Sequence, residues 1–201
     1  MFELINKNGV FLLKSTVLKS NHAFSTRIGG VSEHDHTASL NLAFGRGDEE
    51  ETVVKNLGIF AEAVGFNDKD IISVPQIHSS IIHKVDFSNT GMGYHKSHGF
   101  SCDGYVTVES DLPIGVKTAD CVPILIEARD SNENVIAVSA VHAGWRGTAD
   151  RIVENAVNKL CALFVAFCNR KLQVVDLQFS CFYLIITLKC APLIPFCLRW
   201  E

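Results

Sequence analysis

The sequence has no excess of basic residues, because 18 Lys and Arg stand against 22 Asp and Glu, for a net charge of -4. A protein that follows a nucleic-acid backbone needs a positively charged surface, so this balance argues against nucleic-acid binding. The seven cysteines include no repeated Cys-x-x-Cys pair. That absence, together with the odd number, argues against a structural zinc ribbon and against a secreted disulfide framework.

The sequence pattern also contains no targeting or membrane segment. The first seven residues have no basic stretch followed by a long apolar core, so we expect no signal peptide and a reducing, cytoplasmic environment. An apolar run at residues 181–198 has the single charge Lys189, but Pro192 and Pro195 interrupt it and no basic cluster flanks it. These features favour a strand over a membrane span.

Glycine is absent from the last 54 residues, although 14 glycines occur up to Gly147. The last 41 residues hold five of the seven cysteines and 28 apolar residues, and their net charge is +2. Residues 1–160, in contrast, carry a net charge of -6. We therefore expect an acidic domain over residues 1–160 that lacks its C-terminal part, followed by an atypical apolar tail over residues 161–201.

The spacing of apolar residues predicts a mixed α/β fold for the first 160 residues. Helical spacing predicts helices at 48–65 and 148–164, with Gly65 as the C-cap of the first. Apolar runs bounded by turn residues predict a hairpin at 2–14 and strands at 22–27, 71–76, 81–86, 104–108, 114–117, 122–127 and 135–141. Two helices are too few for strict βαβ alternation. The expected fold class is therefore α/β in the α+β sense, a layered mixed sheet flanked by helices, as an incomplete domain.

Three residues that can bind a soft metal ion lie at predicted strand ends: His78, Cys121 and His142. Separations of 43 and 21 residues place them on different strands. Three protein ligands with an open fourth position are the pattern of catalytic zinc. The residues alone leave a second interpretation open, in which the histidines are ordinary core or surface residues and the cysteine is a small apolar side chain.

Several short motifs occur in an order that resembles one protein family. They are Phe24-Ser-Thr-Arg-Ile-Gly-Gly-Val-Ser32, Asn41-Leu, Pro75-Gln-Ile-His78, Asp103-Gly, Thr118-Ala-Asp-Cys121-Val-Pro and His142-Ala-Gly-Trp-Arg-Gly-Thr148. Together they look like the laccase-domain family, which is also called the polyphenol oxidase or purine nucleoside phosphorylase family.

The resemblance implies a layered α/β fold and one zinc ion held by His78, Cys121 and His142, with copper as the other metal claimed for relatives. It also implies purine nucleosides and phosphate as partners. The reactions implied are phosphorolysis of adenosine, inosine and 5'-methylthioadenosine, and deamination of adenosine by some members.

The chemistry of phosphorolysis adds further candidates. Arg27 and Arg146 could bind the phosphate dianion in a fork geometry, although a surface ion pair is the alternative for each. Asp120 could orient a water or hold a ligand histidine, or it could bond to nearby backbone. Asn41 could meet a ribose hydroxyl or cap a turn, and Trp145 could stack on a base or anchor packing. We predict Asp120 and Arg27 as catalytic residues, and Arg27, Asn41 and Arg146 as substrate or phosphate contacts.

Three rival interpretations compete with this one. A multicopper oxidase is disfavoured because its copper sites need about ten imidazoles, and the chain has eight histidines. A cysteine hydrolase would use Cys121 as nucleophile and His142 as base, with no metal on the thiol. A catalytically inactive truncated form would keep the three ligands and lack part of the active-site wall.

Overall fold

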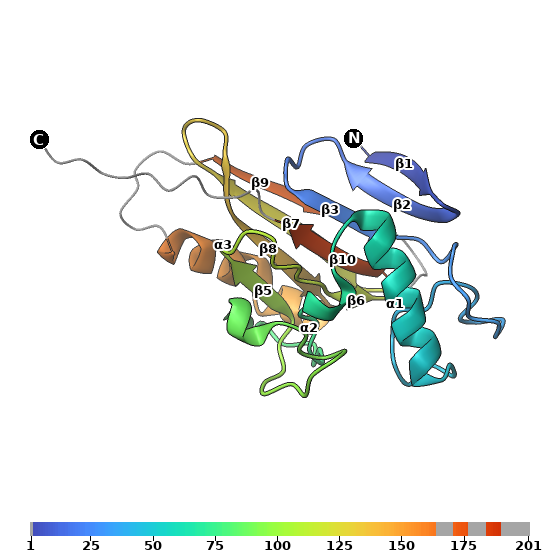
Figure 1. Cartoon of the computed structure of the whole chain (residues 1–201). Helices are drawn as coiled ribbons and strands as arrows, with labels where there is room; N and C mark the ends of the chain where they lie inside the picture. Colours follow the sequence, from blue (N-terminus) through green and yellow to red (C-terminus); the bar gives the residue numbers. More distant parts are fainter. Residues whose placement is uncertain (1, 164–170, 177–183, 190–201) are drawn as a thin grey trace, which may run out of the picture.

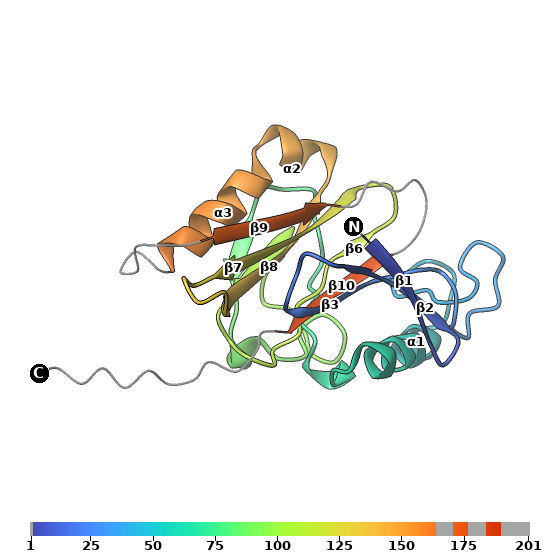
Figure 2. The same cartoon turned by 90° about the horizontal axis from the view of Figure 1, so that it is seen from above.

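The protein folds into four layers, which Figure 2 shows edge-on: helix α1, two β-sheets, and the helices α2 and α3. The computed structural model describes residues 2–163, 171–176 and 184–189. The strand orders of the two sheets are β1-β2-β3-β10-β6 and β4-β5-β8-β7-β9 (Figure 1). The strands are β1 (Phe2–Lys7), β2 (Val10–Ser15), β3 (Asn21–Ser25), β4 (Ile82–Lys84), β5 (Gly104–Thr107), β6 (Lys117–Thr118), β7 (Val122–Arg129), β8 (Val135–Ala143), β9 (Lys171–Asp176) and β10 (Leu184–Lys189). The helices are α1 (Glu50–Val64), α2 (Trp145–Ala149) and α3 (Ile152–Ala162), with short 3-10 turns at Asp68–Asp70 and Phe87–Asn89.

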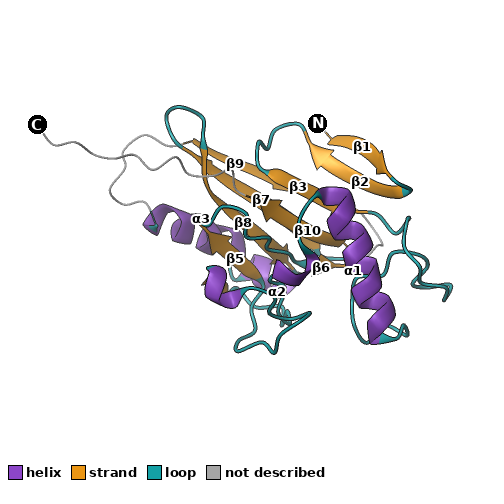
Figure 3. Ribbon diagram, in the orientation of Figure 1, coloured by secondary structure: helices purple, strands orange, loops and turns teal. Residues whose placement is uncertain are grey.

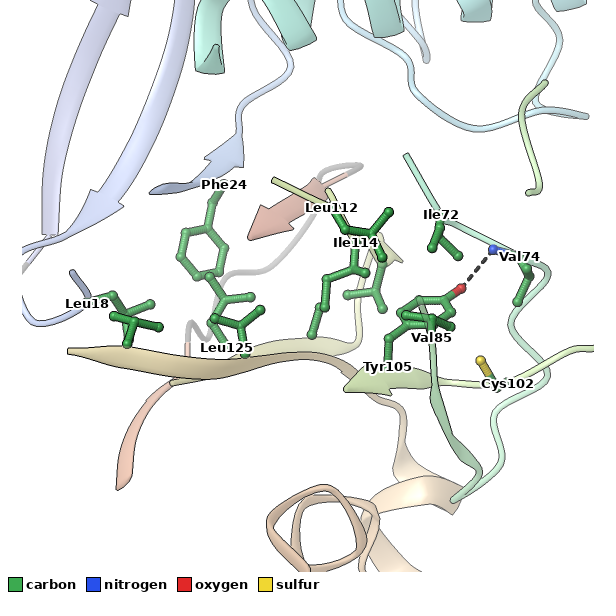
Figure 4. Close-up of a cluster of buried hydrophobic side chains, with 14 residues drawn as sticks. Leu18, Phe24, Ile72, Val74, Val85, Cys102, Tyr105, Leu112, Ile114 and Leu125 are labelled. Atoms are coloured by element: carbon green, nitrogen blue, oxygen red, sulfur yellow. Dashed lines mark hydrogen bonds between the residues drawn. The ribbon is translucent and has the colours of Figure 1, made fainter. Parts of the chain in front are cut away.

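This arrangement confirms the predicted α/β class of layered sheets flanked by helices (Figure 3). The layers follow from the alternation of side chains along each strand. In β7, Leu125 faces the space between the sheets, whereas its neighbours Ile124 and Ile126 pack in the cluster that contains α3. In β3, Phe24 likewise faces the space between the sheets, and Ala23 packs in the cluster that contains α1. Figure 4 shows the apolar layer between the two sheets.

Two local features predicted from the sequence, the hairpin turn and the C-cap of the first helix, are present. β1 and β2 pair as an antiparallel hairpin, and the turn residues Asn8 and Gly9 have φ values of 53° and 88°. Positive φ at both positions is what a tight two-residue hairpin turn requires, and Asn-Gly adopts it at low cost. Helix α1 ends at Val64, and Gly65 follows with φ 91° in the left-handed region, as the sequence predicts.

The prediction of a strand at 71–76 was wrong. Ile72 makes one isolated bridge with Ile114, after which the main chain bonds elsewhere: the N–H of Ser73 donates to Met92 and that of Val74 to the Tyr105 hydroxyl. Because its donors go to loop and side-chain acceptors, this segment does not pair as a strand. The strand predicted at 81–86 is shorter in the structure, as β4. The strand predicted at 114–117 was wrong except at its last residue: Ile114 makes only the isolated bridge, and β6 begins at Lys117.

The helix predicted at 148–164 is confirmed over residues 152–162, as α3, but it begins later than predicted. The chain forms α2 and α3, which are separated at Arg151, a residue with φ 59° in the left-handed region. An L-residue in that conformation interrupts helical hydrogen bonding, so residues 148–149 belong to the separate helix α2. The predicted end of the preceding strand before Gly144 is confirmed, since β8 ends at Ala143.

Two strands of the apolar tail belong to the sheets. β9 pairs antiparallel with β7, and β10 lies between β3 and β6. The strand expected within residues 181–198 is therefore present as β10, and the other residues of that range lie outside the described part. The division of the chain at residue 160 stays a prediction. Among the described residues, none of the helices has the length and apolar character needed to cross a bilayer.

Candidate metal centre

The structure brings together the three residues that the sequence singled out as metal ligands. The ligand atoms of His78, Cys121 and His142 all lie within 4.8 Å of one another. The two imidazole rings meet edge to face, with centroids 4.9 Å apart. Two imidazoles and one thiol that converge in this way form a donor set suited to zinc.

The pairing of two strands explains why Cys121 and His142 meet. β7 begins at Val122 and β8 ends at Ala143, and these two residues are partners in the antiparallel register, followed by Pro123 opposite His142. The residue before β7 therefore lies beside the end of β8. The register of one hairpin thus joins two ligands that are 21 residues apart in sequence.

Asp103 holds the third ligand, His78, next to this pair. Its buried carboxylate accepts hydrogen bonds from the backbone N–H groups of Ile77 (3.2 Å), His78 (3.0 Å) and Ser79 (2.7 Å), and from the Ser79 hydroxyl (2.7 Å). The carbonyl of Asp103 accepts from the backbone N–H of His142 at 2.7 Å. One residue therefore positions both ligand histidines.

Asp103 also fixes which nitrogen of His142 is free. Nδ1 of His142 lies 2.8 Å from Oδ1 of Asp103, and since the carboxylate only accepts, Nδ1 carries the proton and Nε2 is left to bind a metal ion. Burial alone would raise the pKa of Asp103. The hydrogen bonds from His142 and Ser79 outweigh it and lower the pKa to about 2, so the carboxylate stays charged at neutral pH.

Gly144 leaves the space between the three ligands open. A Cβ at this position would lie 2.7 Å from Cδ2 of His78, 3.4 Å from Sγ of Cys121 and 3.6 Å from Cε1 of His142. Its backbone, with φ -69°, is one that any residue adopts. Glycine is therefore required here for space and not for conformation, and the space it leaves is bordered by all three candidate ligands.

The centre is accessible from one side. His142 is 3% exposed, Cys121 is half-buried and His78 is exposed. His78 has φ 57°, a conformation that histidine tolerates better than most residues, and its N–H is held by Asp103. One buried, one half-buried and one exposed ligand are compatible with a site that keeps a coordination position for a substrate.

The thiol of Cys121 is not activated by its protein surroundings. Burial and the negative charges of Asp120 and Asp103 raise its pKa. A cysteine that acts as a nucleophile without a metal needs a lowered pKa. A divalent cation at the centre would supply the positive charge that the thiolate needs.

The side chains of Arg27 and Asn41 form hydrogen bonds within their own loop. Nε of Arg27 donates to the carbonyl of Ala38 at 2.7 Å, and Nη2 donates to that of Asp35 at 3.1 Å. The buried amide of Asn41 donates to Ala43 and to Asp48, and it accepts from the N–H of Ala43. These contacts fit the turn-capping interpretation of Asn41, while phosphate binding by Arg27 and ribose binding by Asn41 stay predictions.

Asp120, Trp145 and Arg146 lie next to the centre in sequence and are exposed. The Trp145 side chain is 72% exposed, so the packing-anchor interpretation does not hold for it. The Arg146 guanidinium lies 4.9 Å from the Trp145 ring centroid. The roles assigned to Asp120 and Arg146 from sequence stay predictions.

Comparison with known proteins identifies the family. The sequence profile of the family described as multi-copper polyphenol oxidoreductase laccase matches residues 21–175. The chain belongs to this family. It is 32% identical over 157 residues to a protein of Deinococcus radiodurans named purine nucleoside phosphorylase, a match that covers 77% of this chain and 55% of that protein. It is 34% identical over 141 residues to a protein of an unknown prokaryote named adenosine deaminase, with 69% of this chain and 52% of that protein covered.

Two solved structures have the same fold. YlmD from Geobacillus stearothermophilus superposes with a TM-score of 0.73 and 26% identity, over 87% of this chain and 64% of that chain. YfiH from Bacillus licheniformis superposes with a TM-score of 0.70 and 25% identity. The chain spans about half the length of the curated relatives it matches.

Asp103 is the residue of this laccase-domain centre that sequence reasoning missed. The Asp103-Gly pair is part of the motif set that carries the family resemblance, yet it suggested no role. A carboxylate is almost never fully buried unless it is paired, but only the structure shows that Asp103 is buried. Its five hydrogen-bond donors come from two distant segments, and no local pattern reveals them.

Proposed function

We propose that this chain carries the metal centre of a zinc-dependent purine nucleoside phosphorylase that acts on adenosine, inosine and 5'-methylthioadenosine, with adenosine deamination as a second reaction. The convergence of His78, Cys121 and His142 on the space left by Gly144 carries the proposal. Relatives named purine nucleoside phosphorylase and adenosine deaminase support it. A reducing cytoplasm is the compartment that suits a centre with a free thiol.

The donor set fits one metal ion. Thiolate and imidazole suit zinc, and they suit copper as well, so copper is the second metal to be tested. A multicopper centre fits less well, because the chain has eight histidines and the cluster found among the described residues contains two of them. A bound zinc ion would supply Lewis-acid polarisation and water activation at the open position.

The surrounding residues would divide the remaining work. Asp103 keeps the proton on Nδ1 of His142 and so leaves Nε2 as the nitrogen that would bind a metal ion. The exposed ring of Trp145 offers an apolar face on which a purine base can stack. Arg146 beside it would supply a guanidinium for phosphate, and the exposed carboxylate of Asp120 would carry a proton at its side-chain oxygen.

The test of this function is phosphate-dependent release of a purine base. Zinc-loaded protein is incubated with adenosine or inosine, with and without phosphate, and the products are separated by chromatography. Phosphorolysis yields free base and ribose 1-phosphate only when phosphate is present, whereas deamination yields inosine from adenosine in either case. Folded, zinc-loaded protein that gives neither product would contradict the proposal and favour the inactive form.

A cysteine hydrolase is the second candidate, and one observation favours it. Asp103 orients His142 as the third member of a nucleophile–base–acid arrangement does, with Cys121 close by. The raised pKa of the thiol argues against it. Metal analysis separates the two functions, because a hydrolase needs a metal-free thiol that reacts with iodoacetamide, and a zinc centre holds one ion per chain and protects Cys121 from alkylation.

A further inference from the structure

The segments that carry His78 and Cys121 run side by side before they reach the metal centre. Main-chain pairing joins them only at their start, where Ile72 bridges Ile114 and accepts from the N–H of Gly115 at 3.0 Å. Further along, the Gln76 carboxamide joins them. Its Oε1 accepts from the N–H of Lys117 at 2.7 Å, and its Nε2 donates to the carbonyl of the same residue at 2.6 Å.

These two hydrogen bonds replace the two that one residue of a neighbouring strand would make with Lys117. β6 is a two-residue strand at the edge of its sheet, and an edge strand exposes main-chain groups that need partners. The Gln76 side chain supplies an acceptor and a donor to both main-chain groups of Lys117 at once. The Lys117 side chain is anchored separately, with Nζ 3.4 Å from the carbonyl of Ser73 and 4.9 Å from the Tyr94 ring centroid.

We propose that Gln76 is a positioning residue of the metal centre, a brace that fixes the separation of His78 from Cys121. Gln76 precedes His78 by two residues, and Lys117 precedes Cys121 by four. At about 3.3–3.6 Å per residue, two residues span at most about 7 Å and four at most about 14 Å, so the brace limits how far the two ligand residues can move apart. The inference rests on the proposed metal centre, and it assigns to Gln76 a role in metal affinity without contact with the metal.

If Gln76 had a purely structural role, its removal would lower stability alone. The control variant must therefore lose a comparable pair of side-chain hydrogen bonds away from the metal centre. Asn21 provides it, because its side chain accepts from Nζ of Lys14 at 3.0 Å and donates to the carbonyl of Val64 at 3.0 Å. The variants are Gln76→Met, which removes both bonds at similar length, Gln76→Glu, which keeps the acceptor and loses the donor, and Asn21→Leu.

The experiment measures zinc affinity by chelator competition and the absorption spectrum of the cobalt-substituted full chain. Second-sphere residues typically change metal affinity 10–100-fold, so we expect zinc binding to be weakened about 100-fold by Gln76→Met and about 10-fold by Gln76→Glu. The thiolate-to-cobalt band should shift in both variants. Asn21→Leu should lower the unfolding midpoint while its zinc affinity stays within about twofold of the unaltered protein.

A metal-free measurement keeps failure of the brace apart from failure of the metal centre. Hydrogen exchange is followed in metal-stripped protein, where Gln76→Met should speed exchange of the Lys117 amide and Asn21→Leu should not. If the unaltered chain binds no zinc, the metal centre is wrong, and unchanged Lys117 exchange in Gln76→Met would then overturn the brace as well. If zinc binds but Gln76→Met retains its affinity and cobalt spectrum, the brace alone is overturned.

Discussion

Two polar clusters of this protein are each organised by one aspartate, the half-buried Asp48 and the buried Asp103, and they differ in whether their side chains also border an open space. Asp48 accepts from the side chains of Asn41, Ser32 and Thr37, all of which belong to the same loop and its neighbourhood. Burial raises the pKa of Asp48, but these hydrogen bonds lower it overall. All three donors to Asp48 therefore lie within residues 32–41, and the same loop accepts the hydrogen bonds of Arg27.

The cluster around Asp103, in contrast, borders an open space. The carboxylate binds one nitrogen of His142 and the backbone of His78, and it leaves the metal-binding atoms of both residues directed at a shared space beside Cys121. The comparison teaches that a buried charged network marks a functional site when some of its members keep unused lone pairs that converge. Where every donor and acceptor is used locally, as at Asp48, the network stabilises a loop.

The largest expected effect comes from removing a ligand at the open cluster. Cys121→Ser replaces the thiolate by a poorer zinc donor, so we expect stoichiometric zinc to be lost and affinity to fall at least ~100-fold. Cys161→Ser, at an exposed cysteine on α3, is the control and should keep one zinc per chain. Metal analysis after gel filtration measures both. Equal zinc in the two variants would refute coordination by Cys121.

The second effect tests the space between the ligands. Gly144→Ala places a methyl group 2.7 Å from the His78 ring without straining the backbone, so zinc affinity should fall by about 10-fold or more while the fold persists. Gly58→Ala in α1 is the matched control, because its Cβ would meet nothing within 4 Å and alanine favours a helix interior by roughly 1 kcal/mol. Chelator competition and circular dichroism measure the two properties. Undiminished zinc affinity in Gly144→Ala would show that the open space is not the metal position.

The third effect separates the two aspartates by pH. The folded-state pKa of Asp103 is about 2, below the usual value near 3.9, so its contribution to stability is present above about pH 4 and is lost as the pH falls towards 2. The shift corresponds to a contribution on the order of 2 kcal/mol. Asp103→Asn should flatten this acid-induced loss in urea titrations of metal-stripped protein and weaken zinc binding 10–100-fold.

Asp48→Asn is the comparison for that experiment. It replaces one acceptor oxygen of the loop cluster by an amide donor, so it should lower stability while zinc affinity stays within about twofold. Equal zinc affinities for the two asparagine variants would remove the distinction between the open and the closed cluster.

The smallest effects distinguish the two arginines. Arg27→Ala loses bonds to the carbonyls of Ala38 and Asp35, so the free energy of unfolding should fall by about 1–2 kcal/mol. Arg146→Ala lies at an exposed position, where stability should change by less than about 0.5 kcal/mol, and the KM for phosphate should rise about 10-fold. A rise in the KM for phosphate in Arg27→Ala that exceeds that of Arg146→Ala would return the phosphate site to the residue the sequence first favoured.

Local features of this fold were predictable because their causes lie a few residues apart. The Asn8-Gly9 turn, the apolar face of α1 and its Gly65 C-cap are set by conformational preferences of neighbouring residues. The failures arose where partners are distant. Segment 71–76 has the composition of a strand but bonds to a loop and to Tyr105, and the segment predicted as a strand at 114–117 makes only an isolated bridge at Ile114 before β6 begins.

The candidate site divides in the same way. By itself the sequence determined the donor types, His78, Cys121 and His142, and the family to which their motifs belong, because residue identity sets ligand chemistry. Only the tertiary structure decided that the three meet, because that depends on the register of β7 against β8 and on Asp103. It also decided that Gly144 leaves room between them and that Arg27 binds its own loop. Distances between remote segments are set by strand pairing and buried hydrogen bonds, which are not written in the spacing of residues along the chain.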